Sequence, residues 1–189
     1  LANTFRLIAE NGKAGFYEGE TADKIVAEMQ RGGGLITLND LKAYNVKWRK
    51  PLESKYKDFS ILTMPPPSSG GVALIQLLSM LEKFPLAQSG FQSTASVHSM
   101  VEAERRVYAD RAKYLGDSDF INVPLDSLLS AEYTNFRMKD FNPQKASTSD
   151  SVVAGDFNMW LESFETTHTS IVDEEGNAVS VTTTLNLNY

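Results

Sequence analysis

The chain has 189 residues, of which 42% are hydrophobic and 22% charged, and its formal net charge is −6. This composition is that of an ordinary globular protein, and it excludes a disordered or collagen-like chain. The net negative charge disfavours nucleic acid or an anionic membrane as a partner, and no apolar run approaches the ~20 residues that span a bilayer. The absence of cysteine excludes disulfides, a thiol nucleophile and the usual cysteine-rich zinc site.

The first third of the chain is predicted to form short helices and then a hairpin. We expect helices over residues 5–10, 21–31 and 37–44, the third beginning at Thr37 as its N-cap. In the second helix, apolar residues at helical spacing predict one buried face, and these are Ala22, Ile25, Val26 and Met29. Residues 46–64 change to an alternating pattern, which predicts a β-hairpin.

Two longer helices are expected after the three prolines at 65–67. Residues 72–84 are apolar on nearly all sides, which is typical of a helix buried within a larger protein. The second helix runs from about Thr94 to Leu115, and short helices around Leu125 and Glu132 follow it. The residues of the 94–115 helix that we expect to point inward are Val97, Val101, Ala103, Val107 and Tyr108.

The last part of the chain changes composition twice. Residues 144–165 are rich in Ser, Thr, Asp and Gly, which predicts a mobile loop or linker. The β-rich runs 167–172 and 178–186, joined by turn-forming residues at 173–177, predict a second hairpin. The predicted fold class is therefore α+β, mostly helical with two β-hairpins. The chain lacks an initial Met and stops inside a strand-like run, so we expect a piece of a longer protein.

Most sequence motifs of catalysis are absent, including G-x-S-x-G, the P-loop, G-x-G-x-x-G and H-E-x-x-H. Asp117 and Asp119 are expected to lie in a turn rather than to bind a cation, and His98 is expected to be structural or exposed. Residues 68–71 could bind an anion at the start of the next helix, but a rigid turn is the favoured interpretation. No metal or cofactor site is predicted.

The most informative segment is a polar loop that leads directly into a strand beginning with hydroxyl residues, Glu165-Thr166-Thr167-His168-Thr169-Ser170. A threonine at the head of a strand can attack the carbonyl before it, and water then cleaves the resulting ester. The freed α-amine, with a pKa of ~8, can serve as the base for the threonine's own hydroxyl. Threonine is also common at strand starts for structural reasons, so from these residues alone both interpretations stay open.

Long stretches of the sequence, in order, resemble the γ-glutamyltranspeptidase family. Residues 166–186 resemble the start of the family's small subunit. The stretches that resemble its large subunit are Gly33 to Tyr44, Met64-Pro-Pro-Pro-Ser-Ser-Gly-Gly71, Ala103 to Arg111 and Tyr114 to Pro124. The resemblance implies an N-terminal-nucleophile hydrolase that is made as one precursor, cuts itself and folds as an αββα sandwich. It divides the chain into a large-subunit helical region, a pre-cleavage loop and the first small-subunit hairpin, over residues 1–143, 144–165 and 166–189.

The resemblance also implies roles for individual residues. Thr166 is the expected nucleophile, and the bond between Glu165 and Thr166 is the expected cleavage site. Thr184 resembles a second threonine that hydrogen-bonds the nucleophile, and Asn186 resembles a residue that helps to hold the γ-glutamyl group. Without the resemblance, Thr184 and Asn186 would be interpreted as ordinary strand residues. The Asp110-Arg111 step is expected to belong to the scaffold.

The implied reaction removes the γ-glutamyl group from glutathione or related amides and passes it to water or an amino acid, with no metal or organic cofactor. The family's other substrate-binding and oxyanion residues have no counterpart here, so this chain alone is expected to be inactive and uncut. The implied partners are the γ-glutamyl substrates and the remainder of the small subunit, and the implied location is periplasmic or secreted.

Two alternatives remain open at this point. One is a non-enzymatic remnant that folds as a scaffold and self-associates through the open strand edge at 178–186. The other is a sister enzyme of the same superfamily, such as a cephalosporin acylase or a poly-γ-glutamate processing enzyme.

Overall fold

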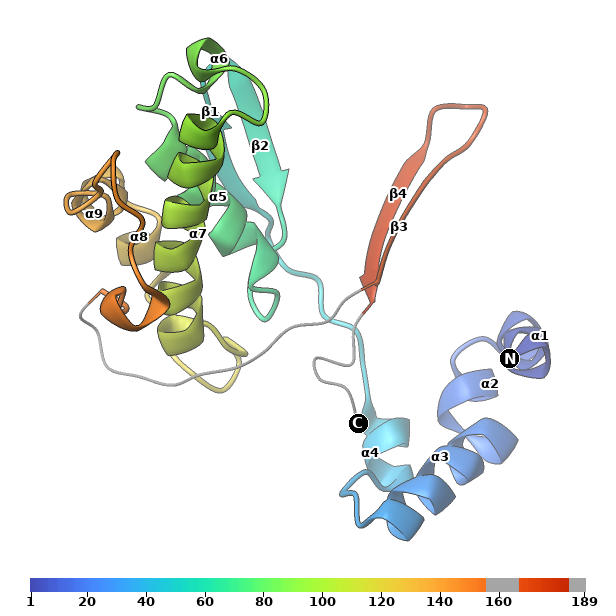
Figure 1. Ribbon diagram of the computed structural model, residues 1–189. Helices are drawn as coiled ribbons and strands as arrows, with labels where there is room; N and C mark the ends of the chain where they lie inside the picture. The colour runs from blue at the N-terminus through green and yellow to red at the C-terminus, as the bar shows by residue number, and fades with distance from the viewer. Residues whose placement is uncertain (156–166, 184–189) are drawn as a thin grey trace. The chain divides into compact units, whose positions relative to one another are not determined.

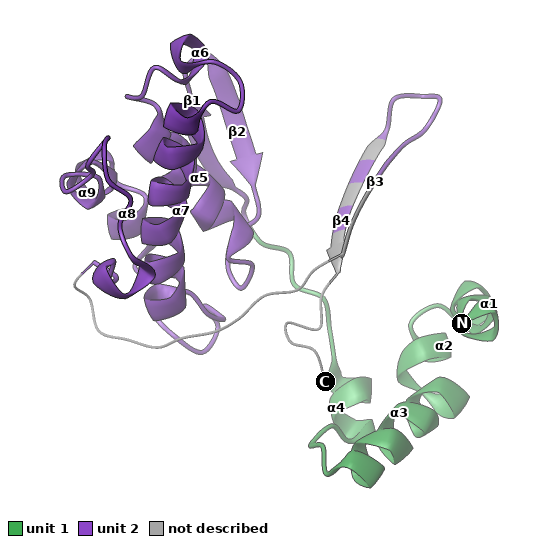
Figure 2. Cartoon of the chain, viewed as in Figure 1, with its two compact units in different colours: residues 1–49 green, residues 50–189 purple. Residues whose placement is uncertain are grey.

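The computed structural model describes residues 1–155 and 167–183, whose order along the chain can be followed in Figure 1. The chain divides into two compact units, Leu1–Arg49 and Lys50–Tyr189 (Figure 2). The sequence did not indicate this boundary, because no cluster of Gly, Pro or Ser marks it. None of the described helices is both long enough and apolar enough to cross a membrane.

The first unit consists of four helices: α1 (Ala2–Asn11), α2 (Ala14–Tyr17), α3 (Gly19–Gly32) and α4 (Leu38–Ala43). The three predicted helices are confirmed, and the buried face of α3 contains Ala22 and Val26 as expected. Helix α2 was not predicted, because four residues carry no periodic pattern. Its Gly15 lies so close to α1 that an added Cβ would come within 2.1 Å of the Leu7 carbonyl oxygen.

Helix α4 begins with a capping box. The Asp40 amide donates to the Thr37 hydroxyl at 3.3 Å, and the Thr37 amide donates to the Asp40 carboxylate at 2.8 Å. Both backbone donors would otherwise lack a partner at the first turn. The predicted N-cap is therefore confirmed.

The second unit is built around α5 (Gly70–Leu81), which contacts strand β1 (Leu52–Tyr56), α7 (Thr94–Tyr114), α8 (Leu125–Leu128) and α9 (Ala131–Arg137). Strand β1 pairs with β2 (Phe59–Thr63) as an antiparallel hairpin, which confirms the first predicted hairpin. Helix α6 (Leu86–Ser89) precedes α7, and a 3₁₀ turn, η1, spans Ser149–Ser151. The buried residues of α5, seven of its twelve, confirm that this helix is enclosed.

The buried face of α7 differs from the one that hydrophobicity predicted. Ala103 and Val107 are fully buried as expected. The other three residues predicted to point inward are exposed by 45%, 37% and 41%, and they are Val97, Val101 and Tyr108. The buried positions are instead shared with three charged residues, Glu102, Arg106 and Asp110. Charged groups can be buried only when they are paired and hydrogen-bonded, so an apolar pattern does not reveal such a face.

The second predicted hairpin is confirmed over the described residues. Strand β3 (Thr167–Val172) pairs antiparallel with β4 (Ala178–Thr183). The turn between them is held by Asp173. Its carboxylate accepts from the Asn177 backbone N–H at 2.8 Å and from the Asn177 side-chain nitrogen Nδ2 at 2.8 Å. Together the described residues form an α+β arrangement, mostly helical with two hairpins.

Candidate functional site

The four site residues predicted from the sequence, Glu165, Thr166, Thr184 and Asn186, lie outside the described residues. The structure does describe Thr167 and Thr183, which are the chain neighbours of Thr166 and Thr184. Thr167 is paired with Thr183 in the β3–β4 ladder, and this is the outermost described pair at the open end of the hairpin. Directly opposed residues of antiparallel strands have Cα atoms about 4.5–5.5 Å apart. Thr166 and Thr184 are therefore attached to neighbouring backbone positions on adjacent strands.

On the other side of the predicted cleavage site, the chain is held at Gly155 by three side chains of α7. The Gly155 amide donates to the Asp110 carboxylate at 2.9 Å. The Gly155 carbonyl accepts from the Tyr114 hydroxyl and from the Lys113 ammonium, the latter at 3.2 Å. Both backbone polar groups of this buried glycine are thus satisfied by side chains rather than by water.

Helix α9 adds a fourth side chain to the same place. Arg137 donates to the Val153 carbonyl at 2.9 Å and also pairs with the Asp110 carboxylate, Nη2 to Oδ1, at 3.1 Å. Asp110 is completely buried and Arg137 is 10% exposed, so the pair is shielded from water. We call the set Asp110, Lys113, Tyr114 and Arg137 the 155 clamp.

The fit around Gly155 leaves no room for a side chain. A Cβ added there would come within 2.1 Å of the Tyr133 hydroxyl oxygen and 2.8 Å of its ring. Burial and the neighbouring Asp110 carboxylate both raise the pKa of Tyr133, so its phenol keeps its proton at neutral pH. The position therefore requires glycine for close approach.

A second cluster, centred on Arg106, ties α7 to the chain between α9 and η1. Arg106 donates to Glu102 at 2.8 Å and to Asp140 at 2.7 Å, and its Nε donates to the Arg137 carbonyl at 2.7 Å. The second Glu102 oxygen accepts from the Ser147 amide at 2.8 Å. The described part of the predicted 144–165 loop is thus held against α7 at several points. The mobility of that loop and the three predicted region boundaries stay predictions.

Glu102 should make the stability of the protein depend on pH in the acid range. Burial alone would raise its pKa, but hydrogen bonds from Arg106 and Ser147 outweigh burial and lower the pKa from 4.5 to about 2. A lowered pKa in the folded state stabilises the protein above the unfolded value, and this contribution is lost as the pH falls from 4.5 towards 2. Urea unfolding at stepped pH measures it: the free energy of unfolding of Glu102→Gln should fall less steeply over this interval than that of the wild type. Parallel curves would contradict the assignment.

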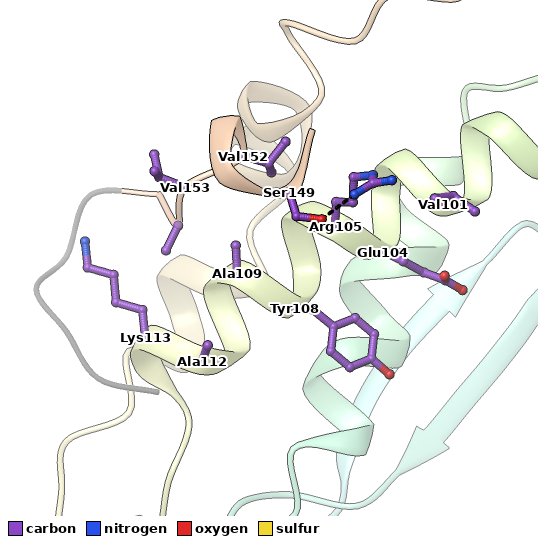
Figure 3. Close-up of a pocket in the computed structure, with 11 residues that line it drawn as sticks. Val101, Glu104, Arg105, Tyr108, Ala109, Ala112, Lys113, Ser149, Val152 and Val153 are labelled. Carbon is purple, nitrogen blue, oxygen red and sulfur yellow. Dashed lines mark hydrogen bonds between the residues drawn. The ribbon is translucent and has the colours of Figure 1, made fainter. Parts of the chain in front are cut away.

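An open groove of about 710 Å³ lies between α7 and residues 149–154. Figure 3 shows Val152 and Val153 on the loop side of the groove and Ala109 and Ala112 on α7. The dashed line in Figure 3 is the hydrogen bond from Arg105 to Ser149, 2.5 Å long. Among the described residues, the lining of this groove is mainly apolar.

The structure also describes the residues of three further predictions from the sequence. Asp119 donates its amide to the Asp117 carboxylate at 2.9 Å, which confirms the predicted turn. The Ser69 hydroxyl accepts from Arg111 at 2.7 Å, which ties the turn before α5 to α7; the choice between a rigid turn and an anion site stays a prediction. His98 packs beside the Phe141 ring, with 5.3 Å between ring centroids. Within residues 1–155 and 167–183, no three His, Asp or Glu side chains gather in a way that could hold a metal ion.

Sequence reasoning treated Asp110-Arg111 as scaffold and missed the 155 clamp. Asp110 pairs with Arg137, twenty-seven residues away, rather than with its neighbour Arg111. A signal was present, because the acidic and basic residues at 102, 106 and 110 recur every four positions on one side of α7. The partners on α9 and at 153–155 could not be identified without the fold.

The chain is similar in sequence to known proteins. The sequence profile of the family described as Gamma-glutamyltranspeptidase matches residues 1–189. The glutathione hydrolase proenzyme of Pseudomonas sp. (strain A14) is 46% identical over 186 residues, which are 98% of this chain and 32% of that protein. The glutathione hydrolase proenzyme of Escherichia coli (strain K12) is 43% identical over 189 residues, 100% of this chain and 32% of that protein.

Solved structures give the same result. The crystal structure of Helicobacter pylori gamma-glutamyltranspeptidase superposes with a TM-score of 0.73 at 40% sequence identity, covering 82% of this chain and 44% of that one. The chain spans about a third of the length of the curated relatives that it matches.

Proposed function

Because the chain belongs to the gamma-glutamyltranspeptidase family, we propose that the protein takes part in the transfer or hydrolysis of γ-glutamyl groups, with glutathione and related amides as donors. The observation that carries this proposal is the family match over all 189 residues. The related proteins are named as proenzymes, which supports a precursor that must be cut before it acts. Water or an amino acid would accept the γ-glutamyl group.

The register of the β3–β4 hairpin supports the roles of the two threonines. Each described pair follows the last by one residue on both strands, from Val172 with Ala178 out to Thr167 with Thr183. We propose that the ladder extends one pair further, which would set Thr184 opposite Thr166. A hydroxyl at that position could donate a hydrogen bond to the nucleophile. Asn186, two residues beyond Thr184 on the same strand, would hold the γ-glutamyl donor.

The first proposed reaction is self-cleavage. The Thr166 hydroxyl attacks the carbonyl carbon of Glu165, and the amide bond breaks as the nitrogen takes up a proton, which leaves an ester between Glu165 and the Thr166 oxygen. Water then hydrolyses this ester. The products are a carboxylate at Glu165 and a free α-amine at Thr166.

The second proposed reaction uses the new amine. With a pKa near ~8 it can accept the proton of its own hydroxyl while that oxygen attacks the γ-carbonyl of the donor. The donor's amine leaves with a proton, and a γ-glutamyl ester remains on Thr166. Water or the amine of an acceptor amino acid then attacks the ester and regenerates the hydroxyl.

We propose that further residues complete the site, because this chain corresponds to about a third of its relatives' length. The remainder of the small subunit is the proposed partner, and an αββα sandwich in a periplasmic or secreted protein is the proposed setting. An oxyanion hole contributes about 2.7–4 kcal/mol per donor, so the 189 residues alone should have little activity.

A time course of intact mass, with N-terminal sequencing, tests the proposal on the complete gene product. We expect a new N-terminus at Thr166, and hydrolysis of a γ-glutamyl anilide that rises in step with the cut. The 189-residue chain provides the control and should remain a single 20.9 kDa species. A complete product that hydrolyses the anilide while uncut would contradict the mechanism, and an uncut product without activity would contradict the function.

A further inference from the structure

We propose that the 155 clamp positions the chain for self-cleavage: Asp110, Tyr114 and Arg137 are positioning residues that fix the start of the segment leading to the bond between Glu165 and Thr166. This inference rests on the proposed function, since it concerns the same cleavage. It adds residues on α7 and α9 that lie at least 29 positions before the cleavage site in the sequence.

The clamp acts on the backbone of one short stretch. The Val153 and Gly155 carbonyls accept hydrogen bonds from side chains of α9 and α7, and the Gly155 amide donates one to the Asp110 carboxylate of α7. Backbone bonds of this kind fix where the chain runs, whatever side chains it carries. A loop that needed only to cross the surface could satisfy the same groups with water.

The groups that form the clamp are unusually well buried for charged and polar side chains. Asp110 is 0% exposed, Arg137 10% and Tyr114 5%. Burying an ion pair costs free energy unless further hydrogen bonds satisfy its polar atoms. Here Asp110 and Arg137 bond each other, residues 153–155 and the Arg106 carbonyl. Gly155 itself fits against Tyr133 so closely that no side chain is admitted. A buried ion pair and a closely packed glycine thus hold one point of the chain in place.

That point is close to the cleavage site along the sequence. Thr166 is the eleventh residue after Gly155, and eleven extended residues reach at most about 40 Å. Without the clamp, the next described hydrogen bond to this stretch from another element is the one from Arg105 to Ser149, seventeen residues before Thr166. Loss of the clamp would therefore lengthen, from eleven residues to seventeen, the stretch between the last such hydrogen bond and Thr166, and it would remove the fixed direction of the chain at Gly155.

The test follows cleavage of the complete gene product during cell-free synthesis, by intact mass. Asp110→Asn removes the charge of the ion pair, and Tyr114→Phe removes only the hydroxyl that bonds Gly155. We expect both to slow the appearance of the Thr166 N-terminus, by about twofold to tenfold, at a temperature where circular dichroism shows them fully folded. Arg137→Met should slow it too, and Arg137→Lys, which keeps a cation able to donate to Val153, should recover part of the rate.

The matched control is Val107→Ala, which creates a cavity at a fully buried residue of α7 that is absent from the clamp. It should lower the melting temperature at least as much as Tyr114→Phe and yet cleave at the wild-type rate. If Asp110→Asn and Tyr114→Phe are both cut at the wild-type rate, the clamp does not position the chain for cleavage, while the proposed function is unaffected. Equal slowing in Val107→Ala would also overturn it, since the effect would then follow stability. A wild-type product that never shows the Thr166 N-terminus would overturn both proposals.

Discussion

Replacing Thr166 with alanine is expected to abolish both self-cleavage and γ-glutamyl hydrolysis in the complete gene product. Alanine has no hydroxyl, so neither the ester with Glu165 nor the γ-glutamyl ester can form. Loss of a catalytic nucleophile typically lowers kcat by several orders of magnitude, and we expect at least a ~1000-fold loss. Intact mass reports the cleavage, and release of aniline from a γ-glutamyl anilide reports the hydrolysis.

Two neighbouring substitutions sharpen this result. Thr166→Ser keeps a hydroxyl and an α-amine, so it should still cut and hydrolyse, at a different rate. Thr167→Ala changes the adjacent residue, whose backbone starts β3, and it should leave the cut between Glu165 and Thr166 in place. If Thr166→Ala is cut at the same bond, or if Thr167→Ala alone stops the cut, Thr166 is not the nucleophile.

Among alanine substitutions of charged residues in the second unit, Arg106→Ala is expected to cause the largest loss of stability. Arg106 and Glu102 are each 1% exposed, and removal of the Arg106 guanidinium leaves the buried Glu102 carboxylate with only the more distant Arg105, at 3.5 Å, as a described cation. Breaking a buried pair in this way costs about 3–5 kcal/mol. Urea unfolding followed by circular dichroism measures the loss.

An exposed ion pair gives the comparison. Lys24 and Glu20 are 74% and 57% exposed on α3, so Lys24→Ala should cost no more than about 1 kcal/mol. The double variant Glu102→Gln with Arg106→Met removes both charges and should lose less stability than Arg106→Ala alone, because no uncompensated charge remains. If Arg106→Ala is as stable as Lys24→Ala, Arg105 or water compensates the Glu102 charge and the prediction is wrong.

Local patterns in the sequence predicted most of the elements. Thr37 with Asp40 marked the start of α4, and the apolar spacing of Ala22 and Val26 marked the buried side of α3. These signals act between residues three or four positions apart, so the sequence alone contains them. The α5 helix was predicted for the same reason, since its apolar residues surround the whole helix axis.

The buried side of α7 could not be identified from its apolar residues, and the four-residue spacing of its charged residues does not by itself indicate burial. Val101 and Tyr108 are apolar and exposed, whereas Glu102 and Asp110 are charged and buried. Charge becomes compatible with burial only through partners distant in sequence, such as Arg137 for Asp110 and Ser147 for Glu102. The chemistry of Thr166 came from a family resemblance over consecutive residues, whereas the 155 clamp is a long-range feature.

The charged interior of α7 has a consequence for attempts to engineer this protein. A stabilised variant designed by filling the helix with apolar residues would remove Glu102, Arg106 and Asp110 as apparent defects, and such replacements often raise stability. The same residues hold the chain at Ser147, Asp140 and Gly155. By the proposed mechanism, such a protein should melt at a higher temperature and be cut more slowly between Glu165 and Thr166, so thermal tolerance and the rate of maturation would move in opposite directions.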